Sequence, residues 1–441
     1  LNRPQVFRCD RTGLERDRRE RRRDRWAKCA PYTGLRAARA LFVVGTCLLV
    51  VACAAMAPTV TPETPAPAEI RPAEPVPAPS EAAPTPEPAT PPLPPAAIEA
   101  PTRELHIAAV GDIMLGGSAA PEVAKRGYDY PFRHVRSSLR SADIAFGNLE
   151  GPLTDIGTPD RHKRYVFRSP SAQVAPALAA AGFNIVSLAN NHTMDYGVEG
   201  LKQTLAALNR AGIEHVGAGM NLQEARRPAF LTAGGHTVAF LAYSLTFPER
   251  FWASSDRPGT AFGHKQQVDA DIRAARSEAD IIVVSFHWGR EATTELRDYQ
   301  SELGHAAIEA GASVVLGHHP HILQGIERYR DGIIFYSLGN FVFGSYSRIA
   351  QRTVIALLRF QNARLIEVRL IPLNVNNIEV VFQPRPLSSA EATQLIEELQ
   401  QLSSPLHTRI AEDHGVGLVS PVENSVQAPL SKKGSDARRE Q

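Results

Sequence analysis

One local pattern occurs five times between residues 106 and 321: a short apolar run is followed at once by polar residues. Short runs of this kind, rich in β-branched residues and bounded by breakers, are typical of strands buried in a parallel sheet. The apolar runs occupy residues 106–110, 142–146, 183–188, 281–286 and 312–316. The polar clusters that follow them are Gly111-Asp112, Gly147-Asn148-Leu149-Glu150, Asn190-Asn191-His192, His287-Trp288-Gly289 and Gly317-His318-His319-Pro320-His321.

Helical patterns precede three of these runs. Residues 174–181 are rich in alanine and stop at Gly182, residues 268–279 lead into the fourth run, and residues 296–310 stop at Gly311. Alternating helices and strands predict an α/β domain with a parallel sheet. Ligands of such sheets bind beyond the carboxyl ends of the strands, which is where the polar clusters fall. We therefore expect the functional site at that edge.

Other segments predict additional elements. A β-hairpin is expected over residues 229–243, with its turn at Gly234-Gly235, and a second hairpin from residues 332–343 with 353–360. Strands are expected at 365–371 and 378–382, forming an antiparallel edge. A helix over 389–402 begins with a possible capping box, Ser-Ser-Ala-Glu. After about residue 415 the composition is polar, and we expect a disordered tail.

The first 57 residues have the layout of an export signal. Residues 1–40 hold 13 Lys+Arg against 5 Asp+Glu, and residues 41–52 are apolar. About a dozen apolar residues are too few to span a bilayer comfortably, but they fit a secretory signal. The stretch ends in Val50-Val51-Ala52-Cys53, which resembles the lipobox of bacterial lipoproteins, so we expect lipidation at Cys53. A buried helix or an uncleaved anchor is the alternative. Because the basic stretch is long and begins with Leu1, we expect the translation start downstream.

Composition divides the remainder of the chain. Residues 58–101 contain 16 prolines in 44 positions and lack the large apolar side chains that would offset chain entropy. The predicted parts are a signal segment (1–57), a disordered linker (58–102), the α/β domain (103–385), and a C-terminal helix with a disordered tail (386–441). All four cysteines lie in the first part, which excludes disulfides, thiolate metal sites and a cysteine nucleophile from the domain.

The polar clusters favour metal binding. Carboxylate, imidazole and amide oxygen together form a ligand set that suits divalent Mn, Fe, Zn or Mg. His319 and His321 are separated by one proline, and a turn can direct both imidazoles at one site. A single loop histidine is usually a solvated side chain, but three within four residues after a buried strand favour ligation. For His318, the third of them, we expect an exposed side chain.

In their order, these clusters resemble the CapA family of poly-γ-glutamate capsule biosynthesis proteins, which is related to the calcineurin-like metallophosphoesterases. The resemblance runs from about residue 105 to 345 and is specific as a set, whereas each block alone is weak. The motifs that carry it are Gly111-Asp112, Gly147-Asn148-Leu149-Glu150, Asn191-His192, His287-Trp288-Gly289-Arg290-Glu291, His319-Pro320-His321 and Ser337-Leu338-Gly339-Asn340-Phe341.

The resemblance implies a four-layer α-β-β-α sandwich with a two-metal site between its sheets. In such a site the two ions lower the pKa of a bridging water and neutralise charge on the attacked centre. His192, next to a ligand, is implied as the general acid for the leaving group. The implied metal ligands are Asp112, Glu150, Asn191, His287, His319 and His321.

Two positions depart from the superfamily pattern. Met114 stands where the superfamily has a first-strand histidine. Glu150 lies one position before the superfamily's aspartate, with Asn148 as an additional oxygen donor. Both changes weaken the first metal position, for which weak binding, a single ion or no ion are the alternatives.

Two further residues belong to the matched motifs. Glu291 is either an additional ligand or base, or a surface residue that opens a helix. Asn340 lies beside a turn shaped by Gly339 and is expected to contact substrate.

The sequence therefore predicts a metal-dependent, hydrolase-like protein anchored at the cell envelope. The family points to poly-γ-glutamate, so that amide hydrolysis or transfer is as conceivable as phosphoester cleavage. The alternative is a polymer-binding or assembly lipoprotein that keeps the fold without turnover. The expected partners are an anionic polymer or phosphoester, the membrane and the envelope biosynthesis machinery. Because an apolar stretch follows the basic run, we expect no nucleic-acid partner.

Overall fold

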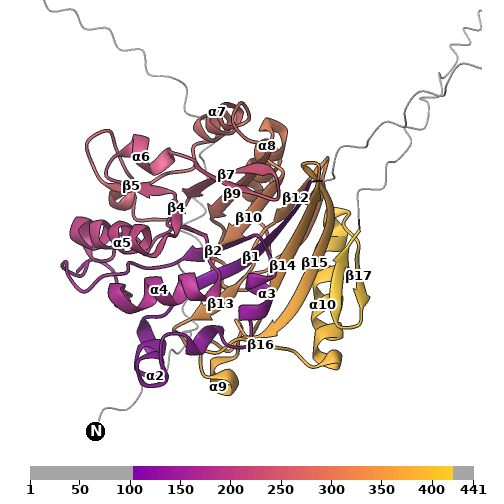
Figure 1. Cartoon of the computed structure of the whole chain (residues 1–441), viewed down its shortest axis with the longest axis horizontal. Helices are drawn as coiled ribbons and strands as arrows, with labels where there is room; N and C mark the ends of the chain where they lie inside the picture. The colour runs from indigo at the N-terminus through magenta and orange to yellow at the C-terminus, as the bar shows by residue number, and fades with distance from the viewer. Residues whose placement is uncertain (1–102, 421–441) are drawn as a thin grey trace, which may run out of the picture. The chain divides into compact units, whose positions relative to one another are not determined.

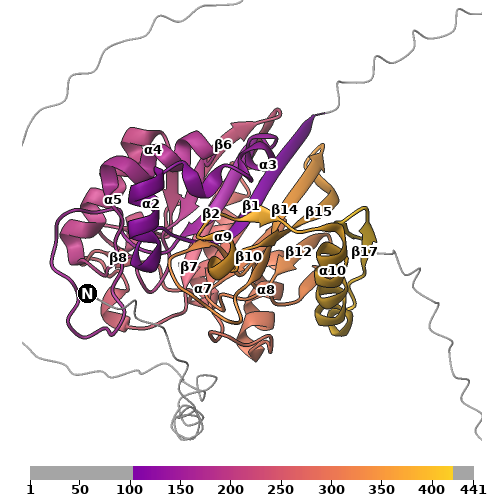
Figure 2. The same ribbon diagram turned by 90° about the horizontal axis from the view of Figure 1, so that it is seen from below.

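The computed structural model describes residues 103–420, which form two β-sheets packed against each other between layers of helices (Figures 1 and 2). The expectations for the signal segment, Cys53, the linker and the tail beyond Ser420 lie outside the described residues. Within residues 103–420, no helix combines the length and the apolar character needed to cross a bilayer.

The first sheet has ten strands, and four neighbouring ones are parallel. The other strands extend this sheet beyond β1, mostly in antiparallel pairs, but β13 pairs with the end of β1 in parallel. The parallel strands are β1 (Glu104–Met114), β2 (Ile144–Leu149), β3 (Ile185–Ser187) and β4 (Glu214–Val216). The others are β13 (Asn340–Phe343), β14 (Arg352–Gln361), β15 (Arg364–Asn374), β16 (Arg385–Pro386), β17 (Ile410–Asp413) and β18 (Val416–Val419).

The second sheet has six strands, with a parallel centre and an antiparallel strand at each edge. Its order is β11-β12-β10-β9-β7-β6. The strands are β6 (Ala229–Ala233), β7 (His236–Ser244), β9 (Ile281–His287), β10 (Val314–His318), β11 (Ile326–Tyr329) and β12 (Gly332–Phe335). A separate pair is formed by β5 (Ala218–Gly219) and β8 (Gly259–Thr260).

Helices cover the outer face of each sheet, α4 and α5 on the first and α7 and α8 on the second (Figure 2). The helices are α2 (Ala120–Arg126), α3 (Arg136–Arg140), α4 (Ser171–Ala181), α5 (Gly197–Ala211), α6 (Leu222–Arg226), α7 (Lys265–Ala275), α8 (Asp298–Ala310), α9 (Asn377–Val380) and α10 (Ser389–Ser403). Helix α10 contacts β15 of the first sheet and β11 of the second. The four-layer α-β-β-α arrangement is therefore confirmed.

The period of two along a strand explains these layers. In β1, Ile107 and Ala109 join the apolar cluster between the sheets, whereas Ala108 and Val110 pack beneath α4 and α5. Both sets are fully buried, so a central strand has no polar face. This is why the five runs appear in the sequence as continuous apolar segments.

Several predicted elements are confirmed. The five runs are strands, the hairpin of β6 and β7 turns at Gly234-Gly235, and α10 begins at the predicted capping box. The predicted strand at 378–382 is wrong because its first half belongs to α9, which begins where the Asn376 side chain accepts a hydrogen bond from the backbone N–H of Ile378. The expectation of a disordered tail from about residue 415 is wrong for β18, which pairs with β15.

The predicted hairpin between residues 332–343 and 353–360 is also wrong. Residues 332–343 contain two strands in different sheets, because β12 pairs with β10 whereas β13 pairs with β1. The chain crosses between the sheets at Ser337-Leu338-Gly339, where Gly339 has a φ of 66°. An apolar segment on each side of this crossing resembles one continuous strand in the sequence. The crossing places Asn340 beside Asp112.

Candidate metal centre

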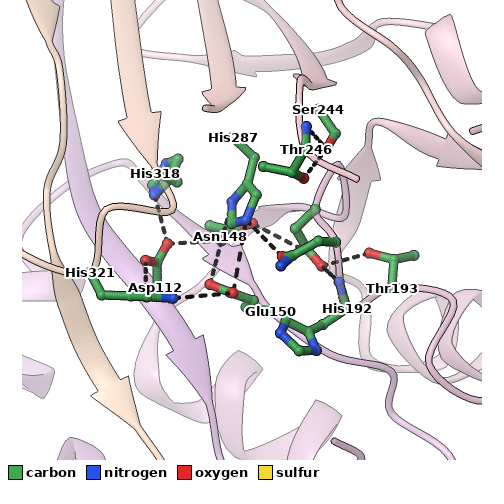
Figure 3. A network of polar contacts seen from close by, with 12 residues as sticks. Asp112, Asn148, Glu150, His192, Thr193, Ser244, Thr246, His287, His318 and His321 are labelled. Carbon is green, nitrogen blue, oxygen red and sulfur yellow. Dashed lines mark hydrogen bonds and ion pairs between the residues drawn. The ribbon is translucent and has the colours of Figure 1, made fainter. Parts of the chain in front are cut away.

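The carboxyl ends of the parallel strands in both sheets bring the predicted polar clusters together (Figure 3). In the first sheet, strand register places Asp112 next to Asn148 on one side and Asn340 on the other. In the second sheet, His287 and His318 are the last residues of neighbouring strands and stand opposite each other. Asp112 lies within β1, beyond a register shift that follows Ala109, and not after the strand's end as expected.

Hydrogen bonds fix the orientation of the Asn148 amide. Asn190 Oδ1 accepts hydrogen bonds from the backbone N–H of His192 (3.1 Å) and from the Thr193 hydroxyl (2.9 Å). The Asn190 NH₂ group therefore points the other way and donates to Asn148 Oδ1 at 3.1 Å. Because its oxygen is taken, Asn148 presents its NH₂ group to the centre of the site.

The NH₂ group of Asn148 contacts side chains from both sheets. Asn148 Nδ2 lies 2.8 Å from Asp112 Oδ1, 3.4 Å from Glu150 Oε2 and 3.3 Å from His287 Nδ1. An amide nitrogen that donates hydrogen bonds is not a metal ligand. In this arrangement Asn148 positions the acidic groups and the imidazole, in contrast to the expected oxygen donor.

Two groups of possible ligands share one residue. The ligand atoms of Asp112, Glu150 and His321 lie within 4.8 Å of one another, and so do those of Glu150, His287 and His319. Glu150 belongs to both groups and is fully buried. A carboxylate has two oxygens, so Glu150 can contact two cations at once.

Several atoms of this cluster fit a bound cation. Glu150 Oε1, His319 Nδ1 and His318 Nε2 are buried without a hydrogen-bond partner within residues 103–420. An unsatisfied buried polar group costs about 1–3 kcal/mol, so such groups normally have a partner. Oxygen and imidazole nitrogen are ligands that divalent ions accept. The cluster therefore suggests divalent-metal binding.

His321 is oriented by two acceptors. Its Nδ1 lies 3.0 Å from Asp112 Oδ2 and 3.0 Å from Asn340 Oδ1, so Nδ1 carries the proton. Nε2 is then the ligating nitrogen, and it lies 3.7 Å from Glu150 Oε1. Burial opposes the charged ring, but Glu150 and Asp112 raise the pKa of His321 to about 10. Asn340, expected to contact substrate, here positions His321.

His287 and His319 are buried at the carboxyl edge of the second sheet. His287 Nε2 and Asn191 Oδ1 are 3.0 Å apart, which brings these two predicted ligands face to face. Burial lowers the pKa of His287 well below its usual value and that of His319 to about 4, so both rings are neutral at pH 7. Neutral imidazole is the form that binds metals.

The carboxyl group of Glu150 responds to the same surroundings. Burial raises its pKa well above the usual value, and the nearby Asp112 adds to this effect. A buried carboxyl of this kind is protonated unless a cation compensates its charge. Glu291, in contrast, is exposed, although one of its oxygens lies within 4.8 Å of ligand atoms of His319 and His321.

His318 corrects one expectation. Its side chain is fully buried and its Nδ1 lies 3.2 Å from Asp112 Oδ1, whereas the sequence suggested an exposed residue. As the last residue of β10 it points between the sheets and not outward. Met114, which replaces the superfamily histidine, is buried near Gly117 and Gly344. Asp112 thus has two imidazole neighbours, both from the segment at the end of β10.

His192 is held by two residues that the sequence analysis missed. Its Nδ1 lies 2.7 Å from Asp195 Oδ2, and the other oxygen of Asp195 accepts a hydrogen bond from Lys163 at 2.5 Å. Lys163 also donates to the Asn191 carbonyl at 2.6 Å, and Phe167 packs against the ring of His192. The i, i+3 spacing of His192 and Asp195 is a signal that could have identified Asp195.

These contacts fix the protonation of His192. Asp195 only accepts, so Nδ1 of His192 carries the proton and Nε2 is free to exchange one with a bound molecule. Burial lowers the pKa of His192, although the hydrogen bond with Asp195 opposes this effect. At neutral pH the ring therefore accepts a proton at Nε2 before it can donate one.

Comparison with known proteins places the chain in a family. A family profile described as "Bacterial capsule synthesis protein PGA_cap" matches residues 106–345. Among curated relatives, the capsule biosynthesis protein CapA of Bacillus anthracis is 34% identical over 295 residues, which cover 65% of this chain and 70% of that protein. The PGA biosynthesis protein CapA of Bacillus subtilis is 35% identical over 240 residues, which cover 54% of this chain and 63% of that protein.

Solved structures give weaker likenesses. The NAD nucleotidase of Haemophilus influenzae has a TM-score of 0.39 and 13% identity, covering 69% of this chain and 64% of its own. A 5′-nucleotidase precursor of Thermus thermophilus has a TM-score of 0.40 and 14% identity, covering 68% and 58%. Such low scores add nothing to the fold described above. With its profile match over residues 106–345, the chain belongs to the CapA-type family of bacterial capsule synthesis proteins.

Proposed function

We propose that this protein is a metal-dependent hydrolase of the bacterial cell envelope that acts on a capsule-type anionic polymer such as poly-γ-glutamate. The observation that supports it best is the buried cluster in which Glu150 belongs to two ligand groups. The family's description and the names of its relatives point to a capsule polymer. The two relatives are matched over about two thirds of their length.

We assign two divalent ions to this cluster. Asp112, Glu150 and His321 would hold the first ion, and Glu150, His287 and His319 the second. Asn191 would add an oxygen to the second set, because its Oδ1 lies 3.0 Å from His287 Nε2. Bound ions of this type lower the pKa of a coordinated water and stabilise negative charge on the attacked centre. The ligand set suits Mn, Fe, Zn or Mg.

Side chains of this protein would carry out the proton transfer. Asp195 holds the Nδ1–H of His192, so that Nε2 would be the nitrogen that exchanges a proton. The ring would take a proton from the attacking water at Nε2 and donate it to the leaving group, which serves cleavage of a phosphoester or of a γ-glutamyl amide. Lys163 balances the charge of the buried Asp195.

The alternative is a polymer-binding protein of the same family without turnover. Met114 favours it, because a thioether does not replace the superfamily's imidazole as a ligand for hard divalent ions. The donor orientation of Asn148 also removes one oxygen ligand from the first position.

The experiment compares the full-length protein with His192→Ala. Hydrolysis of a phosphodiester and of a γ-linked glutamate oligomer is measured, together with bound metal. We expect His192→Ala to lose about 10²–10⁴-fold in rate while keeping its metal, since general acid–base catalysis contributes this much. The control is His414→Ala, whose side chain is 97% exposed. Bound metal with equal background rates in all three proteins would support the alternative and contradict the hydrolase.

We further propose that Cys53 carries the lipid that holds the protein at the membrane. The support comes from the sequence alone, where Val50-Val51-Ala52-Cys53 follows an apolar stretch. In detergent phase partitioning, Cys53→Ser should move to the aqueous phase, whereas Cys47→Ser should stay with the detergent. A Cys53→Ser protein that still partitions with the membrane fraction would contradict lipid anchoring at this residue.

A further inference from the structure

A pocket of about 370 Å³ lies beside the segment that carries Lys163. Its lining includes Asp160 and Arg161 of that segment, and Arg250 and Arg257 of the loop between β7 and β8. Its volume lies at the lower end of the range for small-ligand sites. No predicted metal ligand lines it, so the pocket is distinct from the metal cluster.

The charge of this pocket is positive. Arg250 donates two hydrogen bonds to Asp160, at 2.6 and 3.0 Å, which neutralises this pair. Arg257 binds only the backbone carbonyl of Trp252 among the described residues, through Nε and one Nη. Arg161 has no hydrogen bond or ion pair with any residue of the range 103–420 and is exposed. Two guanidinium groups therefore remain available to an anion.

Part of the pocket's lining is apolar, because Met194, Phe251 and Pro258 contribute to it. A small hydrated anion such as phosphate gains nothing from such a surface, because it must lose water to approach it. A carboxylate on a flexible aliphatic chain fits both kinds of lining, since its methylene groups can cover the apolar residues and its charge can meet the guanidinium groups.

The pocket is linked to His192 through the backbone. The backbone N–H of Asp160 donates to the Asp195 carbonyl at 2.8 Å, and Met194 is two residues from His192. Three residues after Asp160, Lys163 binds the carboxylate of Asp195. The pocket is therefore built on the same two segments that hold His192.

We propose that this pocket is a subsite that binds a side-chain carboxylate of the polymer next to the bond held at the metal centre. Arg161 and Arg257 would bind the carboxylate, and the half-buried Pro258 would pack against the methylene groups of the polymer. The polymer's identity in this proposal rests on the proposed function, but the subsite itself requires only a carboxylate-bearing chain.

Binding to the full-length protein tests this subsite by titration calorimetry. The probes are a hexamer of γ-linked glutamate, the matched hexamer of γ-linked isoglutamine, whose pendant groups are carboxamides and not carboxylates, and inorganic phosphate. We expect Arg161→Gln with Arg257→Gln to raise the Kd for the glutamate hexamer about tenfold or more. The neutral hexamer should bind weakly and equally to both proteins, and added salt should weaken glutamate binding.

Two further variants separate charge from folding. Arg161→Lys in the Arg257→Gln background should recover part of the affinity, because it restores a positive charge. Arg364→Gln, an exposed arginine at the β14–β15 turn, should bind like the wild type. Both checks are read beside the thermal midpoint of each protein.

An unchanged Kd in the double variant, or a glutamate hexamer that binds no more tightly than phosphate, would overturn the subsite. These binding results do not depend on turnover. Binding that depends on the two arginines, without any hydrolysis, would therefore support the subsite and contradict the hydrolase. Hydrolysis that depends on His192, together with binding that does not depend on the two arginines, would support the hydrolase and contradict the subsite.

Discussion

Asp195 determines which nitrogen of His192 is available for chemistry. It is fully buried and accepts hydrogen bonds from His192 Nδ1 (2.7 Å), Lys163 Nζ (2.5 Å) and the backbone N–H of Phe167 (2.8 Å). With all its partners being donors, the carboxylate can only accept. Asp195 thus acts through His192, as a positioning residue.

Asp195→Asn should lower the rate of hydrolysis about 10²-fold or more, but by no more than His192→Ala does. The amide can rotate to donate to Nδ1, which would leave the proton on the wrong nitrogen. The pH–rate profile of the variant should change shape, whereas a purely structural role would change stability alone. Asp298→Asn, at an exposed helix start, is the control. A variant with the wild-type rate and profile would contradict this role.

Single residues also show where the sequence was informative. The predicted ligands could be identified because each follows an apolar run and lies at or near the carboxyl end of a strand, a position that sequence patterns reveal. Lys163 could not, because it lies in a polar segment with Arg161 and Arg164, and no spacing shows which side chain turns inward. His318 was misjudged because its burial depends on where β10 ends.

Helix α10 is an element whose beginning the sequence specified. The Glu391 carboxylate accepts hydrogen bonds from the Ser388 hydroxyl (2.6 Å) and from the Ser388 backbone N–H (3.1 Å). The helix then buries Leu395, Ile396 and Leu399 in the cluster between the sheets. The capping of α10 therefore contributes to holding the two sheets together at this end.

Ser388→Ala should lower the thermal midpoint by about 1–3 °C, the scale of a lost helix cap in a domain of this size. The Ser388 hydroxyl and backbone N–H lower the pKa of Glu391. A carboxyl group with a lowered folded pKa stabilises above its unfolded pKa, and this contribution is lost as pH falls through the folded pKa. The difference between wild type and variant should therefore shrink in acid. Ser389→Ala, one residue on, should show no such pH dependence.

Elements that depend on long-range pairing were harder to predict. At Gly339 the chain passes from the second sheet to the first. A sequence pattern does not show which sheet a strand joins. The local pattern around Gly234-Gly235, in contrast, specifies its own partner, since a tight turn joins adjacent strands. The local hairpin was therefore confirmed and the distant one was wrong.

At the scale of the whole molecule, the metal centre joins the two sheets. Asp112 and Glu150 come from the first sheet, whereas His287, His319 and His321 come from the second. A ligand that binds only the folded state adds to its stability by mass action. The layers themselves were predictable, because alternating helices and buried strands allow few other arrangements.

Removal of metal should therefore lower the thermal midpoint of the protein. We expect a chelator to decrease it and added Mn²⁺ or Zn²⁺ to restore it, as followed by circular dichroism. Asp112→Asn should respond less than the wild type, because one ligand group is incomplete. Equal midpoints with and without chelator, in a protein that had bound metal, would contradict the link between the sheets.

Glu150 is the residue that both ligand groups share, so a two-ion centre requires its carboxylate. The measurement is the number of divalent ions bound per chain in the full-length protein, determined by mass spectrometry of the metals. Glu278→Gln, an exposed position, is the control for Glu150→Gln. We predict two ions in the wild type and the control, and at most one in Glu150→Gln. A wild type that binds no ion, or a Glu150→Gln protein with the full number, would contradict the proposed metal centre.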